Sequence, residues 1–297
     1  MKIYYKNRYS ETLIIEKVPG MMILKLLYSH TFMKPLLKFI VANKFLSSFY
    51  GKLMKSGKSK KKISKFVSEY NINMNESEKS ISEFNSFNDF FIRKLKPNAR
   101  PIDPNPYSII SPADGKILIY KDIDNTKFFS IKGNKFNIDI LLQNNELSKT
   151  FQNCSIVIIR LAPTDYHRFH FPCPSVAQET HEIAGYYYSV SPIALTKLPN
   201  IFCQNKRTLC EVHNEQIGKY IIMEIGATMV GSIINTSPPH TQMSKGEEKG
   251  YFEFGGSTVV LLTQKGKIKF DDDLLLNSNE GIETKICMGE QIGLFDI

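Results

Sequence analysis

Hydrophobic and polar positions follow two different patterns along this chain of 297 residues. In the first part, Met21–Phe49 is dense in Leu, Ile, Met and Phe, but four lysines interrupt it and Pro35 stands in its middle. Because proline is tolerated in the first turn of a helix and not in its interior, the pattern predicts two short amphipathic helices that meet at Pro35. No apolar run reaches the roughly 18 residues that cross a bilayer, so no transmembrane helix is predicted.

From Ile109 onward the pattern becomes typical of β-structure. Short apolar runs are separated by Gly, Pro, Asn and Asp; they include Lys116–Tyr120, Ser155–Leu161, Tyr220–Ile225 and Ser257–Leu262. The predicted fold class is therefore α+β, with N-terminal amphipathic helices followed by a mostly antiparallel, sandwich-like or barrel-like domain. The boundary is placed in a polar stretch near residue 85, which gives a helical, basic segment at 1–85 and a β-rich domain at 86–297.

Charge is distributed unevenly along the chain. The net charge is +9, yet residues 1–66 hold 15 Lys and Arg against only Glu11 and Glu16, and the remainder is mildly acidic. This asymmetry points to an anionic surface, either acidic lipid or nucleic acid. Because no nucleic-acid-binding motif accompanies the Lys60–Lys62 run, a lipid surface is favoured over nucleic acid. Packing of the helices on the protein's own core or on a second subunit is left open as the alternative to a membrane.

The start of the chain and its cysteines indicate the compartment. Met1–Lys6 lacks an apolar core followed by a cleavage site, so no signal peptide is predicted. The five cysteines are odd in number and widely spaced, without a Cys-x-x-Cys pair. They are predicted to be reduced thiols of a cytosolic protein, with no zinc site.

The chemistry of the chain is concentrated near its C-terminal end. In Lys249–Leu262, aromatic residues alternate with other residues and are followed by Gly255 and Gly256, then by Ser257, and then by a Val/Leu run. This order predicts a strand, a glycine turn and a buried strand. The Ser257 hydroxyl can attack the carbonyl of Gly256, and elimination and hydrolysis of the resulting ester would leave a pyruvoyl group at residue 257. On this motif alone, an ordinary Gly-Gly hairpin is the favoured interpretation.

Two further stretches supply acid and base groups. His167 and His170 are three residues apart beside Asp165, and in a plain strand they would face opposite ways, so a bend is needed if both serve one cavity. Asp114 lies in a Pro-x-Asp-Gly turn that is ordinary turn chemistry by itself. An Asp, a His and Ser257 make a plausible triad for a hydrolase or for self-cleavage. The serine lacks a Gly-x-Ser-x-Gly elbow, which argues against a conventional hydrolase.

Five motifs in this order and spacing resemble those of phosphatidylserine decarboxylases. They are Phe87–Arg93, Pro112–Gly115, Asp165–His170, Gly226–Ser232 and Lys245–Thr258, and the resemblance covers about residues 84–297. It implies a proenzyme that cuts itself between Gly256 and Ser257 into a β chain of residues 1–256 and an α chain of residues 257–297. The α chain would begin with the pyruvoyl group derived from Ser257.

The resemblance also implies residue roles. Asp114, His170 and Ser257 correspond to the self-cleavage triad, and His167 is expected to handle protons or position substrate during decarboxylation. The family's usual Leu-Gly-Ser-Thr is Gly-Gly-Ser-Thr here, with Gly255 in place of leucine. Because the change lies two residues before the serine, processing is expected to survive.

The implied reaction converts phosphatidylserine into phosphatidylethanolamine and carbon dioxide, without pyridoxal phosphate or metal. The implied partners are phosphatidylserine in an anionic membrane and the α and β chains as a heterodimer; a further homodimer is left open, and no nucleic acid is expected. The protein is predicted to lie peripherally on the cytoplasmic face of the cell membrane. The alternatives are a Ser-His-Asp hydrolase with an uncleaved chain and a non-enzymatic membrane- or RNA-binding protein.

Overall fold

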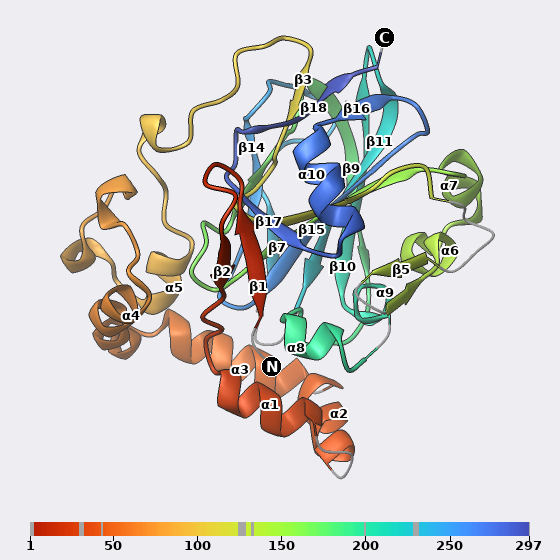
Figure 1. Ribbon diagram of the computed structural model, residues 1–297. Coiled ribbons are helices and arrows are strands. Elements are labelled where there is room, and N and C mark those ends of the chain that lie inside the picture. Colours follow the sequence, from red (N-terminus) through yellow and green to blue (C-terminus); the bar gives the residue numbers. More distant parts are fainter. Residues whose placement is uncertain are drawn as a thin grey trace.

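Helices and mostly antiparallel sheets make up the protein, as the computed structural model in Figure 1 shows. The structure describes residues 3–29, 33–42, 44–123, 129–131, 134–198, 200–227 and 232–296. The α+β class predicted from the sequence is confirmed. In the main sheet the strand order begins at β13 and ends at β2, so the described residues form no closed barrel.

The main sheet has ten strands and contains the positions of interest. In spatial order they are β13 (Gln242–Met243), β9 (Ser175–Ile183), β10 (Arg207–Asn214), β11 (Gly218–Gly226), β15 (Ser257–Thr263), β7 (Ser155–Leu161), β4 (Gly115–Tyr120), β17 (Glu283–Ile286), β1 (Tyr4–Asn7) and β2 (Leu13–Ile15). Neighbouring strands run antiparallel except β1 and β17, which are parallel. Every residue of β15 and β7 is buried, as continuous Val/Ile/Leu runs predict.

Smaller sheets and short helices complete the β-rich part. The remaining strands are β3 (Ser108–Ile110), β5 (Phe129–Ile131), β6 (Asn134–Phe136), β8 (Arg168–His170), β12 (Ile233–Asn235), β14 (Glu248–Phe252), β16 (Ile268–Phe270) and β18 (Gln291–Phe295). They pair as β12-β14-β8, β16-β18-β3 and β5-β6. The helices of this part are α6 (Ile138–Leu142), α7 (Asn145–Thr150), α8 (Pro192–Leu195), α9 (Ile201–Gln204) and α10 (Asp272–Asn279).

The N-terminal helices lie together at one end of the sheet, at the bottom and left of Figure 1. They are α1 (Met21–Ser29), α2 (Lys34–Ala42), α3 (Lys44–Lys55), α4 (Lys62–Tyr70) and α5 (Phe87–Phe91). Pro35 is the second residue of α2, where its missing N–H costs no helical hydrogen bond. The predicted break at Pro35 is present, but a third helix, α3, begins within the same stretch, where only two helices were predicted. Among the described residues, none of these helices is long and apolar enough to cross a bilayer.

The first residues of the chain differ from the helical segment predicted for 1–85. Before α1, the chain forms β1 and β2, and β1 joins the main sheet by pairing with β17, for example Tyr5 with Glu283. These strands were not predicted because they are short, half-exposed and stabilised by a partner from the other end of the chain. The helix α5, which follows the predicted boundary, packs against α3 and α4.

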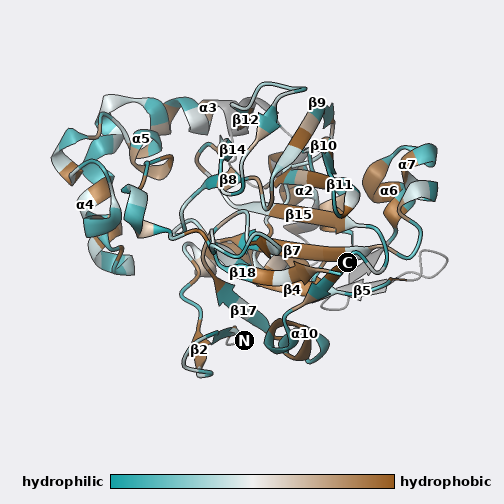
Figure 2. Cartoon of the chain, turned by 90° about the horizontal axis from the view of Figure 1, so that it is seen from above, coloured by the Kyte–Doolittle hydropathy of each residue, from teal (hydrophilic) through white to brown (hydrophobic). Residues whose placement is uncertain are grey.

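Two apolar cores are present, and the larger one also includes Tyr28 of α1 and Leu37 of α2. The larger core runs through the central strands, and Figure 2 shows β15, β7 and β4 as the hydrophobic centre of the molecule. The smaller core contains Met54, Ile63, Phe84, Phe87, Phe90 and Phe91, with Phe66 and Phe254 packed against it. These aromatic residues therefore join the helices to the segment just before Ser257.

Candidate functional site

Ser257 is the first residue of β15 and lies in the middle of the main sheet. It stands opposite Gly226 of β11 on one side and Leu161 of β7 on the other, and it has no exposed surface. Its Oγ has no hydrogen-bond partner among the described residues. A buried hydroxyl without a partner costs on the order of 1–3 kcal/mol, so this atom is free to react rather than held by a hydrogen bond.

The turn before Ser257 has the geometry that glycine permits. Gly255 has φ +148°, a conformation that L side chains rarely adopt. At Gly256 an added Cβ would meet Val190 Cγ2 at 3.5 Å and Ala227 Cβ at 3.7 Å, which are ordinary contacts. The backbone conformation at 255 therefore favours glycine in this chain, while at 256 space alone does not require it.

The segment before the turn is held by the helices. The backbone N–H of Phe254 donates to Asn88 Oδ1 at 3.0 Å, and Lys55 Nζ lies 2.7 Å from Glu253 Oε1. The Phe254 ring contacts Phe91 with a centroid distance of 5.0 Å in an edge-on arrangement. Helices α3 and α5 thus fix the chain three residues before the predicted cleavage point.

His167 is completely buried just before β8. Its Nδ1 lies 2.8 Å from the carbonyl oxygen of Asp165, and its ring lies against Phe91 with a centroid distance of 3.9 Å. Because a carbonyl can only accept, Nδ1 carries the proton and Nε2 has the free lone pair. Nε2 has no partner among the described residues. Burial lowers the pKa of His167 to about 4, so the ring is neutral near pH 7.

His170, the last residue of β8, is also a buried, neutral imidazole. Its ring stacks on Tyr166 at 5.7 Å, and its Nδ1 has no partner among the described residues. Burial lowers its pKa to about 4, against the opposing influence of the Glu248 and Asp114 carboxylates. Both histidines of the predicted motif are therefore in the form that can accept a proton.

Asp114 is engaged by other groups. Arg100 donates to it from Nε and from Nη2, the latter at 2.6 Å, and the Met288 N–H donates at 2.8 Å. Its negative charge acts to raise the pKa of both His167 and His170, against the larger effect of burial. Asp114 therefore lies within electrostatic range of both rings. In the described part of the chain it makes no hydrogen bond to either ring, and the triad of Asp114, His170 and Ser257 stays a prediction.

A buried ionic network was not predicted from the sequence. It contains three carboxylates and three cations: Glu16, Asp165 and Glu283 with Lys116, Arg160 and Lys285. The carboxylate of Asp165 therefore accepts hydrogen bonds from Lys116 and Lys285, and its backbone carbonyl accepts one from His167. The available signal was the presence of Lys116 and Arg160 inside otherwise apolar strands.

A cavity of about 330 Å³ reaches Gly255 and Gly256. Apolar residues from the N-terminal segment line one side of it, including Val18, Pro19, Ile23, Leu24 and Leu27. Tyr50, Phe66, Phe254 and the loop residues Ala162 and Pro163 contribute further walls. The predicted cleavage point thus borders a largely apolar chamber.

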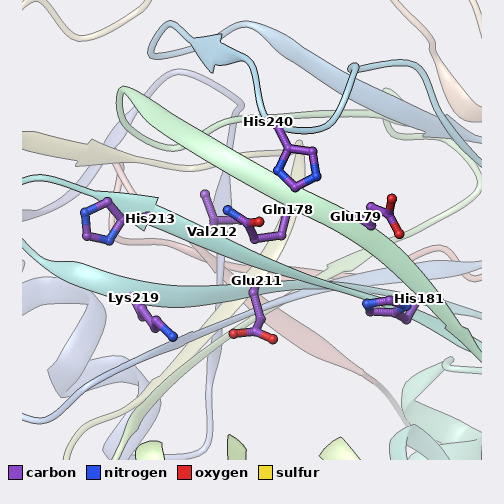
Figure 3. A pocket seen from close by; sticks show the side chains of 8 residues that line it. All are labelled: Gln178, Glu179, His181, Glu211, Val212, His213, Lys219 and His240. Atoms are coloured by element: carbon purple, nitrogen blue, oxygen red, sulfur yellow. The ribbon is translucent and has the colours of Figure 1, made fainter.

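A second cavity in the described part of the chain differs from this one. A cavity of about 610 Å³ on β9, β10 and β11 contains His181, His213 and His240, but Figure 3 shows these rings well apart. Among the described residues, no group of three or more His, Cys, Asp or Glu could hold a metal ion. In the predicted motif Gly226–Ser232, residues 228–231 lie outside the described residues.

A buried serine after two glycines, with two buried neutral histidines on and just before β8, which pairs with the strand that leads into the glycine turn, supplies the groups for acyl chemistry at a serine. The sequence matches the family model described as "Phosphatidylserine decarboxylase" over residues 87–294. The chain belongs to the phosphatidylserine decarboxylase family.

Relatives extend the similarity over nearly the whole chain. The phosphatidylserine decarboxylase proenzyme of Clostridium tetani (strain Massachusetts / E88) is 46% identical over 291 residues, which cover 98% of each chain. That of Clostridium botulinum (strain Alaska E43 / Type E3) is 45% identical over 293 residues, or 99% of this chain and 98% of its own. That of strain Eklund 17B / Type B is 46% identical over 295 residues, with the same coverage.

Proposed function

We propose that this protein is a proenzyme that cleaves itself between Gly256 and Ser257 and then decarboxylates phosphatidylserine. The observation that carries the proposal is the Oγ of Ser257, which is buried without a partner directly after a glycine turn. Relatives at about 46% identity are named proenzymes of this decarboxylase, which supports both cleavage and reaction.

The self-cleavage needs a base, an attacking hydroxyl and one water. A neutral histidine, His170 by its place in the motif, takes the hydroxyl proton while Oγ bonds to the Gly256 carbonyl carbon and the amide nitrogen leaves as the amine of residue 257. Loss of the α-proton then breaks the Cβ–Oγ bond and frees the Gly256 carboxylate. Water replaces the nitrogen, ammonia departs, and a pyruvoyl group remains at residue 257.

The residues around position 257 fit such a group. It would supply a carbonyl that condenses with the substrate amine and withdraws the electron pair left behind by carbon dioxide. His167 can hold and return a proton at Nε2, because its Nδ1–H is fixed on the Asp165 carbonyl. The buried surroundings exclude water from this exchange.

We further propose that the substrate is reached from an anionic membrane by way of α1, α2 and α3. Large apolar side chains are exposed on all three helices: Met22, Ile23, Leu26, Leu36, Phe39, Phe49 and Leu53. Exposed lysines such as Lys38 and Lys52 lie among them, which suits acidic headgroups. The apolar cavity at Gly256 is lined by α1, so a lipid on this face would have a short path to the site.

A denaturing gel and a carbon dioxide assay test the proposal together. Wild-type protein should separate into chains of residues 1–256 and 257–297 and release carbon dioxide from phosphatidylserine. Ser257→Ala should stay in one piece and release none. An uncleaved wild-type chain whose Ser257 is labelled by a fluorophosphonate would instead support the hydrolase alternative.

A further inference from the structure

Glu16 is a buried carboxylate in the otherwise basic first part of the chain. It follows β2 and stands five residues before α1, with 4% of its surface exposed. Arg160 donates to it from Nη1 at 3.1 Å and from Nη2 at 2.7 Å, and Lys116 Nζ lies 3.7 Å away. A paired, two-pronged contact of this kind fixes the position of the backbone that carries it.

The same arginine has a second carboxylate partner. Arg160 donates from Nε and Nη2 to Glu283 of β17, at 3.0 and 2.7 Å. Both carboxylates are almost completely buried, and each binds the same guanidinium through two hydrogen bonds. Glu16 and Glu283 therefore form a natural pair for comparison, since loss of either removes one charge from one buried cation.

The two carboxylates differ in what they are attached to. Glu16 and Arg160 line the cavity at Gly256, and Val18–Gly20 and the inner residues of α1 continue the wall directly from Glu16. Glu283 does not line the cavity; it lies on β17 between β4 and β1. Of these two carboxylates, only Glu16 leads into the apolar wall and also binds Arg160 of β7, the strand beside β15.

We propose that Glu16 is a positioning residue for substrate binding: its ion pair with Arg160 holds the segment 18–27 as the wall of the cavity next to the cleavage point. This inference rests on the proposed function, because it takes the cavity as the place of the lipid substrate. With Glu16 neutral, the wall loses its charged attachment to Arg160, while Asp165 keeps its hydrogen bonds from Lys116 and Lys285 and its carbonyl stays beside His167. Binding should weaken and the chemical step should not.

The test compares Glu16→Gln with Glu283→Gln in the processed enzyme, with a short-chain, water-soluble phosphatidylserine as substrate. We expect Glu16→Gln to raise KM about tenfold with kcat within about twofold of wild type, the pattern of lost uniform binding. Glu283→Gln should leave KM within about twofold of wild type. Equal KM effects of the two variants, or none from Glu16→Gln, would overturn the inference.

Binding without turnover gives a second readout. In the Ser257→Ala background, calorimetry with the same lipid should show a dissociation constant raised about tenfold by Glu16→Gln and unchanged by Glu283→Gln. If Glu16→Gln does not accumulate as folded protein, Glu16→Asp keeps the charge and shortens the reach, and a smaller rise of the same constant is expected. If Glu16→Asp folds as well as the wild type and leaves the dissociation constant unchanged, the proposal is contradicted. A wild-type enzyme that released no carbon dioxide would show failure of the proposed function itself.

Discussion

The Nδ1 atom of His167 lies 2.8 Å from the backbone carbonyl oxygen of Asp165. The ring is thereby held by the main chain of a residue whose carboxylate is itself fixed by Lys116 and Lys285. This arrangement leaves Nε2 as the free, basic nitrogen of a fully buried imidazole. His170 has no equivalent contact at its Nδ1 among the described residues, so the two histidines of one motif differ in how they are held.

We expect the two histidines to have different functions, His170 in self-cleavage and His167 in decarboxylation. His170→Ala should accumulate as one uncleaved chain, because the base for attack by Ser257 is missing. His167→Ala should be cleaved but should release carbon dioxide at least about 100-fold more slowly, the usual contribution of a positioned acid or base. A gel and a carbon dioxide assay on both proteins measure this. If His170→Ala were cleaved and His167→Ala were not, the roles assigned to the two histidines would be reversed.

The low pKa values of both histidines make stability depend on pH. Burial holds each pKa near 4, below the ordinary value of 6.5. Between these values the unfolded chain binds protons that the folded chain does not, so stability is complete above about pH 6.5 and falls toward pH 4. Each histidine should account for a loss on the order of 3 kcal/mol at pH 4.

Urea unfolding of the Ser257→Ala protein at several pH values measures this effect on a single chain. His170→Gln in that background should remove a substantial part of the loss between pH 6.5 and pH 4, because glutamine has no proton to bind there. The carboxylates contribute equally to the pH dependence of stability in both proteins, so their effect cancels in the comparison. If the free energy of unfolding fell equally with pH in both proteins, His170 would not resist protonation in the folded state.

The hydrogen bond from the Phe254 N–H to Asn88 should matter for self-cleavage. Asn88→Ala would leave that N–H without its acceptor and loosen the chain two residues before Gly256, at a cost on the order of 1–3 kcal/mol. We expect uncleaved protein to persist several-fold longer in a pulse-chase gel. Lys55→Ala is the control, because Lys55 is half-exposed and its contact with Glu253 is worth about 1 kcal/mol or less. Equal rates in both variants would show that the Asn88 contact does not guide cleavage.

Membrane binding should combine lysine charge with exposed apolar side chains. Binding to vesicles that contain phosphatidylserine should fall steeply as salt is raised, because exposed charges are screened beyond about 8 Å at physiological ionic strength. Met22→Ser combined with Phe39→Ser should weaken binding further at every salt concentration. Tyr107→Ser, an exposed aromatic outside these helices, should have no effect. Salt-independent binding would favour a purely apolar anchor or a subunit contact, and an equal loss in Tyr107→Ser would show that binding does not depend on these helices.

The sequence predicted those parts of the structure whose signals are local. The helix break at Pro35 and the glycine turn before Ser257 each depend on a few adjacent residues. The two histidines could be predicted as a pair for the same reason, although their low pKa values depend on burial that no short motif specifies.

The features that were missed depend on residues far apart in the chain. Strand β1 is held by β17, and Arg160 binds Glu16 and Glu283, which are 144 and 123 positions away. A charged residue in an apolar strand indicates that a partner exists, but it does not say which one. For the same reason, the pairing of Asp114 with Arg100 appears only in the folded chain.

The most direct test of self-cleavage is the intact mass of the purified protein. The uncleaved chain has a mass of 34.0 kDa. We expect two smaller species instead: residues 1–256 ending in a free carboxylate at Gly256, and residues 257–297 lighter by one ammonia than a chain that begins with serine. A single species of 34.0 kDa in a sample that releases carbon dioxide from phosphatidylserine would contradict the account.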